Sequence, residues 1–301
     1  KTEFMKLLLS LFTVCVFTIS YAQDFTEVLK GVAFNRGEED RMGFSVAIDG
    51  NYAVVGSYAH DEDGSDPNTG AAYIYEKTGI DNWQFVQRII NSDQDNYDRF
   101  GYSVAIDGEM IVVGAYGEDH DMDDDNSLSS AGSAYIFKRG IDGVWTEMQK
   151  IIASDRDEDD EFGWSVDISD STVIVGAHHE GHDLAGLNFM YHAGAAYIFD
   201  LDELGVWNET QKIVASQRSV DRYYPAGRDD DYEDISDLFG GAVAIDGDYI
   251  IVGAHNHDYD TGGYRSGTQW NAGAAYIFER SAGVWSETQK LLNHGTDLVM
   301  Q

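Results

Sequence analysis

Residues 100–108 read Phe-Gly-Tyr-Ser-Val-Ala-Ile-Asp-Gly, and versions of this phrase begin at residues 42, 162 and 239. The glycine at its second position stands at 43, 101, 163 and 240, so the intervals are 58, 62 and 77 residues. A repeat of this length built from strand-like pieces is typical of propellers and other modular arrays. One unit alone is too small to bury a core. Any function therefore belongs to the assembled units or to their loops.

The sequence of each unit predicts four strands. Val104 and Ile106 alternate with small or polar residues in the first strand, and the apolar residues 110–115 give the second. The Asp-Gly pair between them predicts a type I′ hairpin, which needs positive φ at both central residues. The third strand corresponds to residues 132–137, and the fourth runs from Trp145 to Ile151. The sequence thus predicts an all-β propeller of four-stranded antiparallel blades, with four repeats present.

The phrase that begins each unit pairs with a Val-Gly-Ala motif twelve residues or so further on. Phe100-Gly101 pairs with Val113-Gly114-Ala115, and the same order returns at 162–163 with 175–177 and at 239–240 with 252–254. The first unit is degenerate, with Met42-Gly43 and Val55-Gly56-Ser57. These residues resemble the FG-GAP repeats of integrin α-subunit propellers, and more closely the FG-GAP-like repeats of secreted bacterial proteins. The resemblance covers about residues 25–292 and implies a propeller that binds other molecules.

One departure from the integrin pattern concerns calcium. The resemblance implies an Asp-rich calcium loop between the first two strands of a unit, but here that connection is only Asp-Gly. Such a turn is too short to surround Ca²⁺ with six or more oxygen atoms. Calcium binding of the integrin type is therefore not expected at this position.

The repeats place domain boundaries at about 34–91, 92–153, 154–215 and 216–292 within a region of residues 23–301. Residues 25–33 match the fourth strand of later units, so five fourth-strand sequences accompany four copies of the other three. We expect the chain to be truncated at its C-terminus and to belong to a larger ring of about seven blades. The alternative is a complete small ring that carries residues 24–33 as an extension.

Residues 1–22 have the pattern of a secretory signal peptide, with residues 1–4 upstream of a true start at Met5. Lys6 supplies the positive charge, residues 7–19 are apolar, and Ser20 and Ala22 are the small residues before a cleavage site. The apolar run is short for a membrane span. We therefore expect a secreted or cell-surface bacterial protein without a membrane span.

The formal net charge of −35 disfavours binding to nucleic acid or to anionic membranes. More than half of the 54 acidic residues lie in the connections after the second and fourth strands of each unit. In an antiparallel blade these connections share one side, which we call the acidic loop face. We expect a protein or glycan ligand there, and the loop expansion at residues 223–237 is the predicted specificity element.

Closely spaced aspartates in these loops are candidate Ca²⁺ ligands, because Ca²⁺ prefers carboxylate oxygens. The alternative is a solvated acidic rim that only promotes solubility. Ca²⁺ is the one cofactor that the sequence suggests. The candidate metal residues are Asp61, Asp63 and Asp66, Asp121, Asp123 and Asp125, and Asp155, Asp157 and Asp159.

Three further patterns have structural interpretations. An aspartate lies two residues before each repeated phrase, at 40, 98, 160 and 237, and is expected to bond the local backbone. Residues 178–182 read His-His-Glu-Gly-His, but the spacing differs from the zinc motif His-Glu-x-x-His, so we expect loop histidines near solvent. The tryptophans that begin the fourth strands are expected to pack in the core or rim; they are Trp83, Trp145, Trp207 and Trp285.

The sequence therefore predicts a non-catalytic binding or adhesion module, calcium-dependent through its acidic loops. One alternative is a carbohydrate-active or other hydrolytic enzyme, which would bring acidic and aromatic residues together at the centre of the propeller. Another is a purely structural domain of a larger surface protein.

Overall fold

The computed structural model describes residues 37, 39–61, 68–80, 82–122, 127–218, 220–221, 235–257 and 272–292. Residues 1–30 form a separate unit from residues 31–301, and both the predicted signal peptide and the extra fourth strand at 25–33 lie outside the described residues. The described part contains strands and loops but no helix, and hence no helix that could span a bilayer. The all-β prediction is confirmed.

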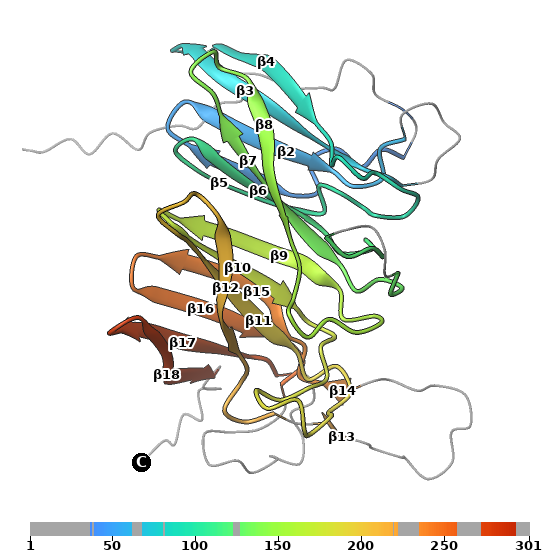
Figure 1. Cartoon of the computed structure of the whole chain (residues 1–301), viewed down its shortest axis with the longest axis vertical. Coiled ribbons are helices and arrows are strands. Elements are labelled where there is room, and N and C mark those ends of the chain that lie inside the picture. Colours follow the sequence, from blue (N-terminus) through green and yellow to red (C-terminus); the bar gives the residue numbers. More distant parts are fainter. Residues whose placement is uncertain are drawn as a thin grey trace, which may run out of the picture. The chain divides into compact units, whose positions relative to one another are not determined.

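The strands form four antiparallel sheets of four strands, each in chain order (Figure 1). The first sheet holds β1 (Val46–Asp49), β2 (Tyr52–Ser57), β3 (Ala71–Gly79) and β4 (Asn82–Ile89). The second holds β5 (Ser103–Asp107), β6 (Met110–Ala115), β7 (Ser133–Arg139) and β8 (Trp145–Ile151). The third holds β9 (Phe162–Ser169), β10 (Thr172–Ala177), β11 (Ala195–Leu201) and β12 (Trp207–Ile213). The fourth holds β15 (Phe239–Asp246), β16 (Tyr249–Ala254), β17 (Ala274–Ser281) and β18 (Val284–Leu292), while β13 (Val220–Asp221) pairs with β14 (Ile235–Ser236).

The hairpin turn between the first two strands differs from the predicted one. Asp107 pairs with Met110, so the two central residues are Gly108 and Glu109 rather than Asp and Gly. Gly108 has a φ of 57°, and Glu109 is not among the residues with positive φ. One positive φ at the first central position is the type II′ pattern, so the type I′ prediction is wrong. In the third sheet Asp170 takes this position with a φ of 53°, which aspartate tolerates better than most residues.

The repeated glycines allow neighbouring sheets to approach closely. A Cβ on Gly163 would lie 2.3 Å from the carbonyl oxygen of Ser133 in the preceding sheet, and one on Gly114 would lie 2.0 Å from the carbonyl oxygen of Gly163. Isolated parallel bridges at the same place join Gly70 to Phe100, Gly132 to Phe162 and Gly194 to Phe239. Gly114 and Gly163 are therefore contact points between sheets, where a side chain would displace backbone.

The hydrophobic core lies between neighbouring sheets. Phe100 of the second unit packs with Val54 and Ile74 of the first sheet, and Trp145 joins the same cluster. Trp145, Trp207 and Trp285 are 2–3% exposed, which confirms their predicted packing role, whereas Trp83 is partly exposed. Each sheet thus buries one face against the next, as in the blades of a propeller.

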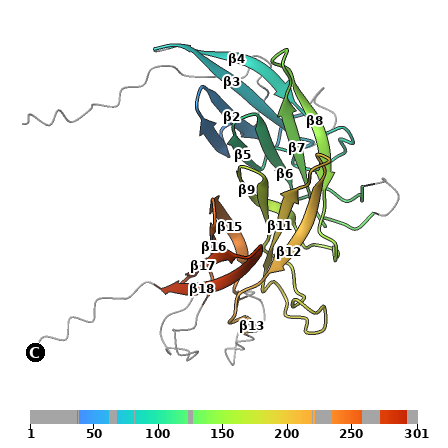
Figure 2. The same cartoon turned by 60° about the vertical axis from the view of Figure 1, so that its left-hand side comes forward.

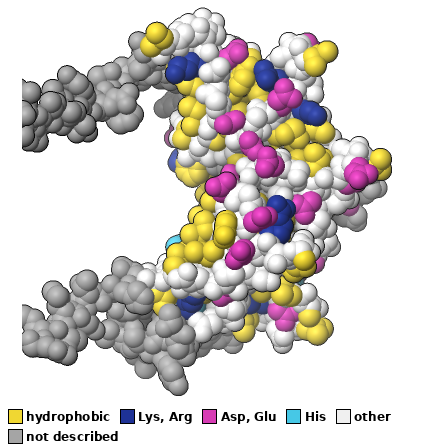
Figure 3. Space-filling model, turned by 90° about the vertical axis from the view of Figure 1, so that its left-hand side faces the viewer, with side chains coloured by type: hydrophobic (Ala, Val, Ile, Leu, Met, Phe, Trp, Pro, Cys, Tyr) yellow, Lys and Arg dark blue, Asp and Glu magenta, His cyan; other side chains and the backbone are white. Residues whose placement is uncertain are grey.

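The arrangement of the sheets follows the order of the chain. Contacts between strands of different sheets join β1 to β5, β5 to β9 and β9 to β15, so the first strands of successive sheets lie side by side (Figure 2). No closed ring is seen among the described residues. The first and fourth sheets expose apolar side chains, including Val46 and Ile48 at 67% and Tyr249 at 58%. Figure 3 shows hydrophobic side chains gathered on the surface of the described part.

Candidate functional site

On the acidic loop face, the residue before each repeated phrase adopts a left-handed backbone. These residues are Arg41, Arg99, Glu161 and Leu238, with φ between 54° and 59°. Residues other than glycine adopt this backbone conformation at a cost of about 1–3 kcal/mol, and such residues cluster at functional sites. The same strained position in all four units directs attention to the side chains around it.

A continuous row of aromatic rings runs beside these positions. Ring centroids are 4.7 Å apart for Phe44 and Tyr102, and 4.6 Å apart for Tyr102 and Trp164. Trp164 lies 4.0 Å from His178, which lies 4.0 Å from His179. We call the full set the aromatic row; it comprises Phe44, Tyr58, Tyr102, Tyr116, Trp164, His178, His179, His192 and Tyr191.

The repeat itself builds this row. Phe44, Tyr102 and Trp164 each follow the glycine of the repeated phrase in successive units. Tyr58, Tyr116 and His178 each follow the end of a second strand. Because the glycine contacts hold the sheets together at these ends, residues about 60 positions apart in the chain become ring neighbours. The fourth unit has Gly241 and His255 at the two positions.

Glu161 and two histidines meet at the centre of the row. Oε2 of Glu161 lies 3.4 Å from Nε2 of His178 and 3.4 Å from Nδ1 of His179. Burial raises the pKa of Glu161 to about 7, although the nearby Arg99 opposes this shift. Burial, with help from neighbouring histidines, lowers the pKa of His178 to about 2 and that of His179 to about 4. Both imidazoles are therefore neutral at pH 7.

Arg99 lines the same region. Its guanidinium carbon lies 4.6 Å from the centre of the Tyr116 ring, and its Nη1 donates a hydrogen bond to the Tyr116 hydroxyl. Burial raises the pKa of Tyr102 and of Tyr116, so both phenols are neutral at physiological pH. The row thus combines aromatic faces with the cation of Arg99 and the carboxyl group of Glu161.

The side chains of residues 178–182 do not converge on one site. Glu180 is fully buried and faces Tyr197 and Lys212, at 3.2 Å and 3.4 Å, while His178 and His179 face Glu161. His178 is 4% exposed, so the expectation that it lies near solvent is wrong. The carboxylate beside the histidines comes from the preceding loop, which spacing within residues 178–182 could not indicate.

A buried charge network recurs near the start of each sheet. In the third sheet, Lys212 Nζ lies 2.7 Å from Asp155, and the Tyr197 hydroxyl donates to the same carboxylate at 2.8 Å. Burial and the charge of Glu180 raise the pKa of Asp160 to about 9. The second sheet repeats this network, and the first and fourth sheets replace the glutamate with a histidine beside the equivalent aspartate. The equivalents are Lys150, Asp93, Tyr135, Glu118 and Asp98, then Asp40 with His60, and Asp237 with His257.

The aspartate before each repeated phrase bonds the local backbone, as predicted, in three units. Oδ2 of Asp98 accepts a hydrogen bond from the backbone of Asp95, and Oδ2 of Asp160 accepts one from Asp157, both at 2.7 Å. Asp40 accepts one from Gly37 at 2.5 Å. In the fourth unit the equivalent backbone donor, residue 234, lies outside the described residues, and Asp237 lies 2.8 Å from Nδ1 of His257. These buried carboxyl groups hold the loops in place.

The predicted calcium ligands fall into two groups. Asp63, Asp66, Asp123 and Asp125 lie outside the described residues. Among the others, Asp155 is engaged with Lys212 and Tyr197, and these hydrogen bonds lower its pKa although burial alone would raise it.

The remaining predicted aspartates lie in loops. Asp61 accepts a hydrogen bond from the backbone of Asn68 at 2.6 Å, and Asp157 accepts one from Glu158 at 2.9 Å. Asp159 has a φ of 63°, and Asp121 lines a surface pocket. In the described part of the chain, the group of three whose ligand atoms lie within 4.8 Å of one another is Glu161, His178 and His179. Calcium binding at the aspartates stays a prediction.

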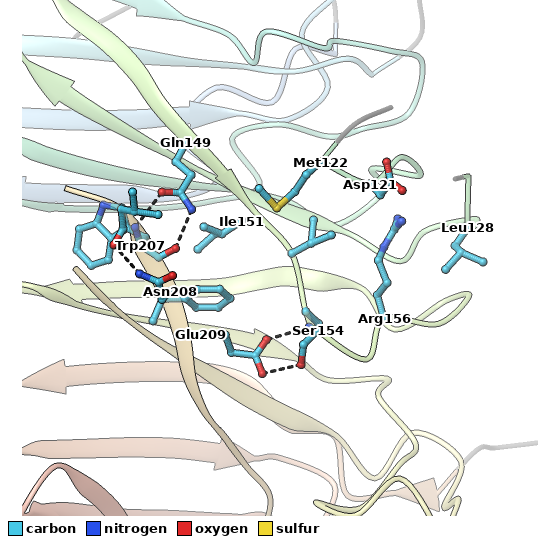
Figure 4. Close-up of a pocket in the computed structure, with 14 residues that line it drawn as sticks. Asp121, Met122, Leu128, Gln149, Ile151, Ser154, Arg156, Trp207, Asn208 and Glu209 are labelled. Carbon is cyan, nitrogen blue, oxygen red and sulfur yellow. Dashed lines mark hydrogen bonds between the residues drawn. The ribbon is translucent and has the colours of Figure 1, made fainter. Parts of the chain in front are cut away.

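A pocket of about 590 Å³ lies between β8 and β12 (Figure 4). Gln149 bonds both backbone groups of Trp207, at 2.8 and 2.9 Å, and Glu209 accepts two hydrogen bonds from Ser154. The same pairings join the other neighbouring sheets, through Gln87 with Trp145, Glu147 with Ser92, Gln211 with Trp285 and Glu287 with Ser216. These polar groups connect sheets, so the aromatic row is the stronger candidate site.

The comparison with protein families matches four segments of the chain. The FG-GAP repeat model covers residues 25–75, 83–137, 145–199 and 231–278. The first three segments begin at a fourth-strand sequence and end at a third strand. The family unit therefore includes residues 25–33, whose sequence matches the fourth strands of later units. No curated protein matches the chain. The matched segments make up more than half of the sequence, and the chain belongs to the FG-GAP repeat family.

Proposed function

We propose that this protein is a secreted or cell-surface binding module, without catalytic activity, that holds its ligand on the aromatic row. The observation that carries the proposal is the continuity of the row across three units, from Phe44 to Tyr191. Ligand sites are typically lined by aromatic side chains with a few polar groups, and Arg99 and Glu161 supply such groups here.

The exposure of the rings supports a surface role. Phe44 and Tyr191, at the two ends of the row, are 51% and 54% exposed. Tyr102, Trp164 and His179 between them are partly exposed. Buried aromatic residues of the core, such as Phe100 and Phe162, are fully shielded. Tyr116 and His178 are buried, so the row presents exposed rings at its ends and partly exposed rings between them.

The ligand class we favour is a glycan that carries no strong negative charge. Flat rings such as Trp164 can stack on the apolar face of a sugar, while Arg99 and Glu161 offer hydrogen bonds. The net charge of −35 repels polyanions. A protein ligand is the alternative, and adhesion follows if the ligand lies on another cell.

The test is a glycan array probed with the full chain and with a Trp164→Ala variant. Binding that disappears in the variant supports the proposal. Glycan binding that is equal in both proteins contradicts the role of the row, and no glycan binding by the wild-type protein contradicts the ligand class.

A hydrolytic function is the second candidate, because Glu161 keeps its proton up to about pH 7 and could act as a general acid. Glycoside hydrolysis also needs a second carboxylate about 5–9 Å away. The groups facing Glu161 most closely are instead His178 and His179, which is why binding without catalysis is preferred. Turnover of a bound glycan that is abolished by Glu161→Gln would reverse this preference.

Calcium dependence is a separate part of the proposal. Its support is the acidic composition of the loops, including residues 62–67 and 123–126, which lie outside the described residues. The corresponding measurement is given with the whole molecule in the Discussion.

A further inference from the structure

The atoms around Glu161 are poorly explained as a hydrogen-bonded group. Its Oε2 lies 3.4 Å from one nitrogen of each neighbouring histidine, whereas an N–H···O hydrogen bond is usually about 2.9 Å long. Oε2 of Glu161, the atom that faces both histidines, is buried and has no hydrogen-bond partner. Buried polar atoms are nearly always satisfied, so this cluster lacks a component.

Two of the three spacings match those between the ligands of a tetrahedral metal ion. Metal–nitrogen and metal–oxygen bonds of 2.0–2.1 Å at tetrahedral angles separate the ligand atoms by about 3.3–3.4 Å. Glu161 Oε2 has this distance to both nitrogens, and all three ligand atoms lie within 4.8 Å of one another. We propose that Glu161, His178 and His179 bind one divalent transition-metal ion, with a fourth position open to water or to a ligand.

The ligand types of the three side chains indicate which metal ion would bind. Two imidazoles and one carboxylate suit Zn²⁺ and similar first-row ions, whereas Ca²⁺ requires six or more oxygens. Burial favours the neutral imidazole, which is the form that ligates a metal. Zn²⁺ is therefore the best match, and this site is distinct from the predicted calcium sites.

The surroundings hold the ligands in position. The ring centroids of Trp164 and His178 are 4.0 Å apart. The ring of His192 stacks on that of His179, with centroids 3.8 Å apart and an interplanar angle of 8°. His179 also hydrogen-bonds the backbone of Asp159. Contacts of this kind fix the orientation of ligating histidines. The metal would lie within the aromatic row, but the inference does not depend on which ligand the row binds.

The test is a Zn²⁺ titration of the full chain after chelator treatment and dialysis, followed by calorimetry in physiological salt. We expect one equivalent of Zn²⁺ with a dissociation constant of about 1 µM or below. Co²⁺ in place of Zn²⁺ should give the intense visible absorption of a four-coordinate site. Binding of no Zn²⁺, or of many weak equivalents only, would overturn the proposal.

Matched variants locate the site. Glu161→Gln and His179→Gln should each weaken Zn²⁺ binding by about 100-fold or more, because even the loss of an outer partner can cost that much. His182→Gln is the control, since its side chain contacts Glu180 outside the cluster and is similarly exposed. Circular dichroism confirms that each variant is folded. Unchanged binding in the first two variants, or an equal loss in the control, would refute the assignment.

Discussion

Asp160 and Glu180 are carboxyl groups buried side by side, and their environment favours a retained proton. Asp160 is 4% exposed and Glu180 is fully buried. Lys212 lies near Glu180 but is also paired with Asp155, so its charge is shared between the two carboxylates. The pKa of Asp160 is raised to about 9 by burial first and by the charge of Glu180 second. Asp98 beside Glu118 repeats the arrangement, with a pKa of about 8.

These raised pKa values predict a loss of stability at alkaline pH. At pH 7 the folded protein keeps protons on Asp98 and Asp160 that the unfolded chain has released, and it loses them as the pH rises through about 8 and about 9. The free energy of unfolding therefore falls as the pH rises, by at most about 1.4 kcal/mol per pH unit for each proton. Denaturant unfolding at pH 7, 8 and 9 measures this slope.

The Asp160→Asn variant removes the contribution of one titrating carboxyl group to the pH dependence of stability. Asparagine can still accept the hydrogen bond from the backbone of Asp157 and can donate to Glu180, but it does not titrate. The slope between pH 7 and 9 should be shallower than in the wild-type protein, and shallower still when Asp98→Asn is added. Identical slopes in all three proteins would show that the carboxyl pairs are ionised when folded.

At the scale of the strands, the repeated glycines determine how one sheet meets the next. Gly43 and Gly163 occupy equivalent positions with φ of 91° and 93°. A Cβ on Gly163 would lie 2.3 Å from a carbonyl oxygen of the preceding sheet, whereas one on Gly43 would meet nothing within 4 Å. The two positions therefore separate backbone strain from contact between sheets.

Gly163→Ala should destabilise the protein more than Gly43→Ala. Both substitutions force a left-handed alanine, at a cost of about 1–3 kcal/mol. Gly163→Ala adds an overlap with backbone, and overpacking usually costs a further 1–3 kcal/mol or so. Equilibrium unfolding of the two variants gives the difference directly. Equal losses would mean that the glycine is needed only for its φ.

The strands and their order could be predicted from the sequence, because alternation and repetition are local properties. The turn type was missed because only the pairing of Asp107 with Met110 shows that Gly108 is the first central residue. The aromatic row was missed because Phe44, Tyr102 and Trp164 are neighbours only through packing between sheets. The signal was nevertheless present: the residue after the repeated glycine is aromatic in three units.

The partnership of Glu161 with His178 and His179 could not be read from local spacing either. The three residues come from the loop before β9 and the loop after β10, which the antiparallel hairpin places at one end. The neighbouring Glu180 instead turns toward Lys212. Glu161 and His178 lie 17 positions apart in the sequence, on either side of one hairpin.

For the whole molecule, the net charge of −35 has a measurable consequence. Acidic groups repel one another in the folded state, and salt screens this repulsion. The melting temperature should therefore rise with NaCl concentration. Specific calcium sites would add to this effect, because a ligand that binds only the folded state stabilises it.

The calcium prediction is tested by comparing millimolar CaCl₂ with NaCl of matched ionic strength, with a chelator as the reference. A higher melting temperature in CaCl₂ is the expected result. Equal melting temperatures in the two salts would leave the acidic loops with the role of promoting solubility.

The central claim is that the aromatic row binds the ligand, and its most direct test is the affinity for the best glycan found on the array. Isothermal titration should compare the wild-type protein with Trp164→Ala and with Tyr249→Ala, an exposed aromatic residue outside the row. We predict that Trp164→Ala weakens binding about tenfold or more, which corresponds to about 1.4 kcal/mol, and that Tyr249→Ala leaves it unchanged. Equal affinity in the wild-type protein and Trp164→Ala would contradict the account.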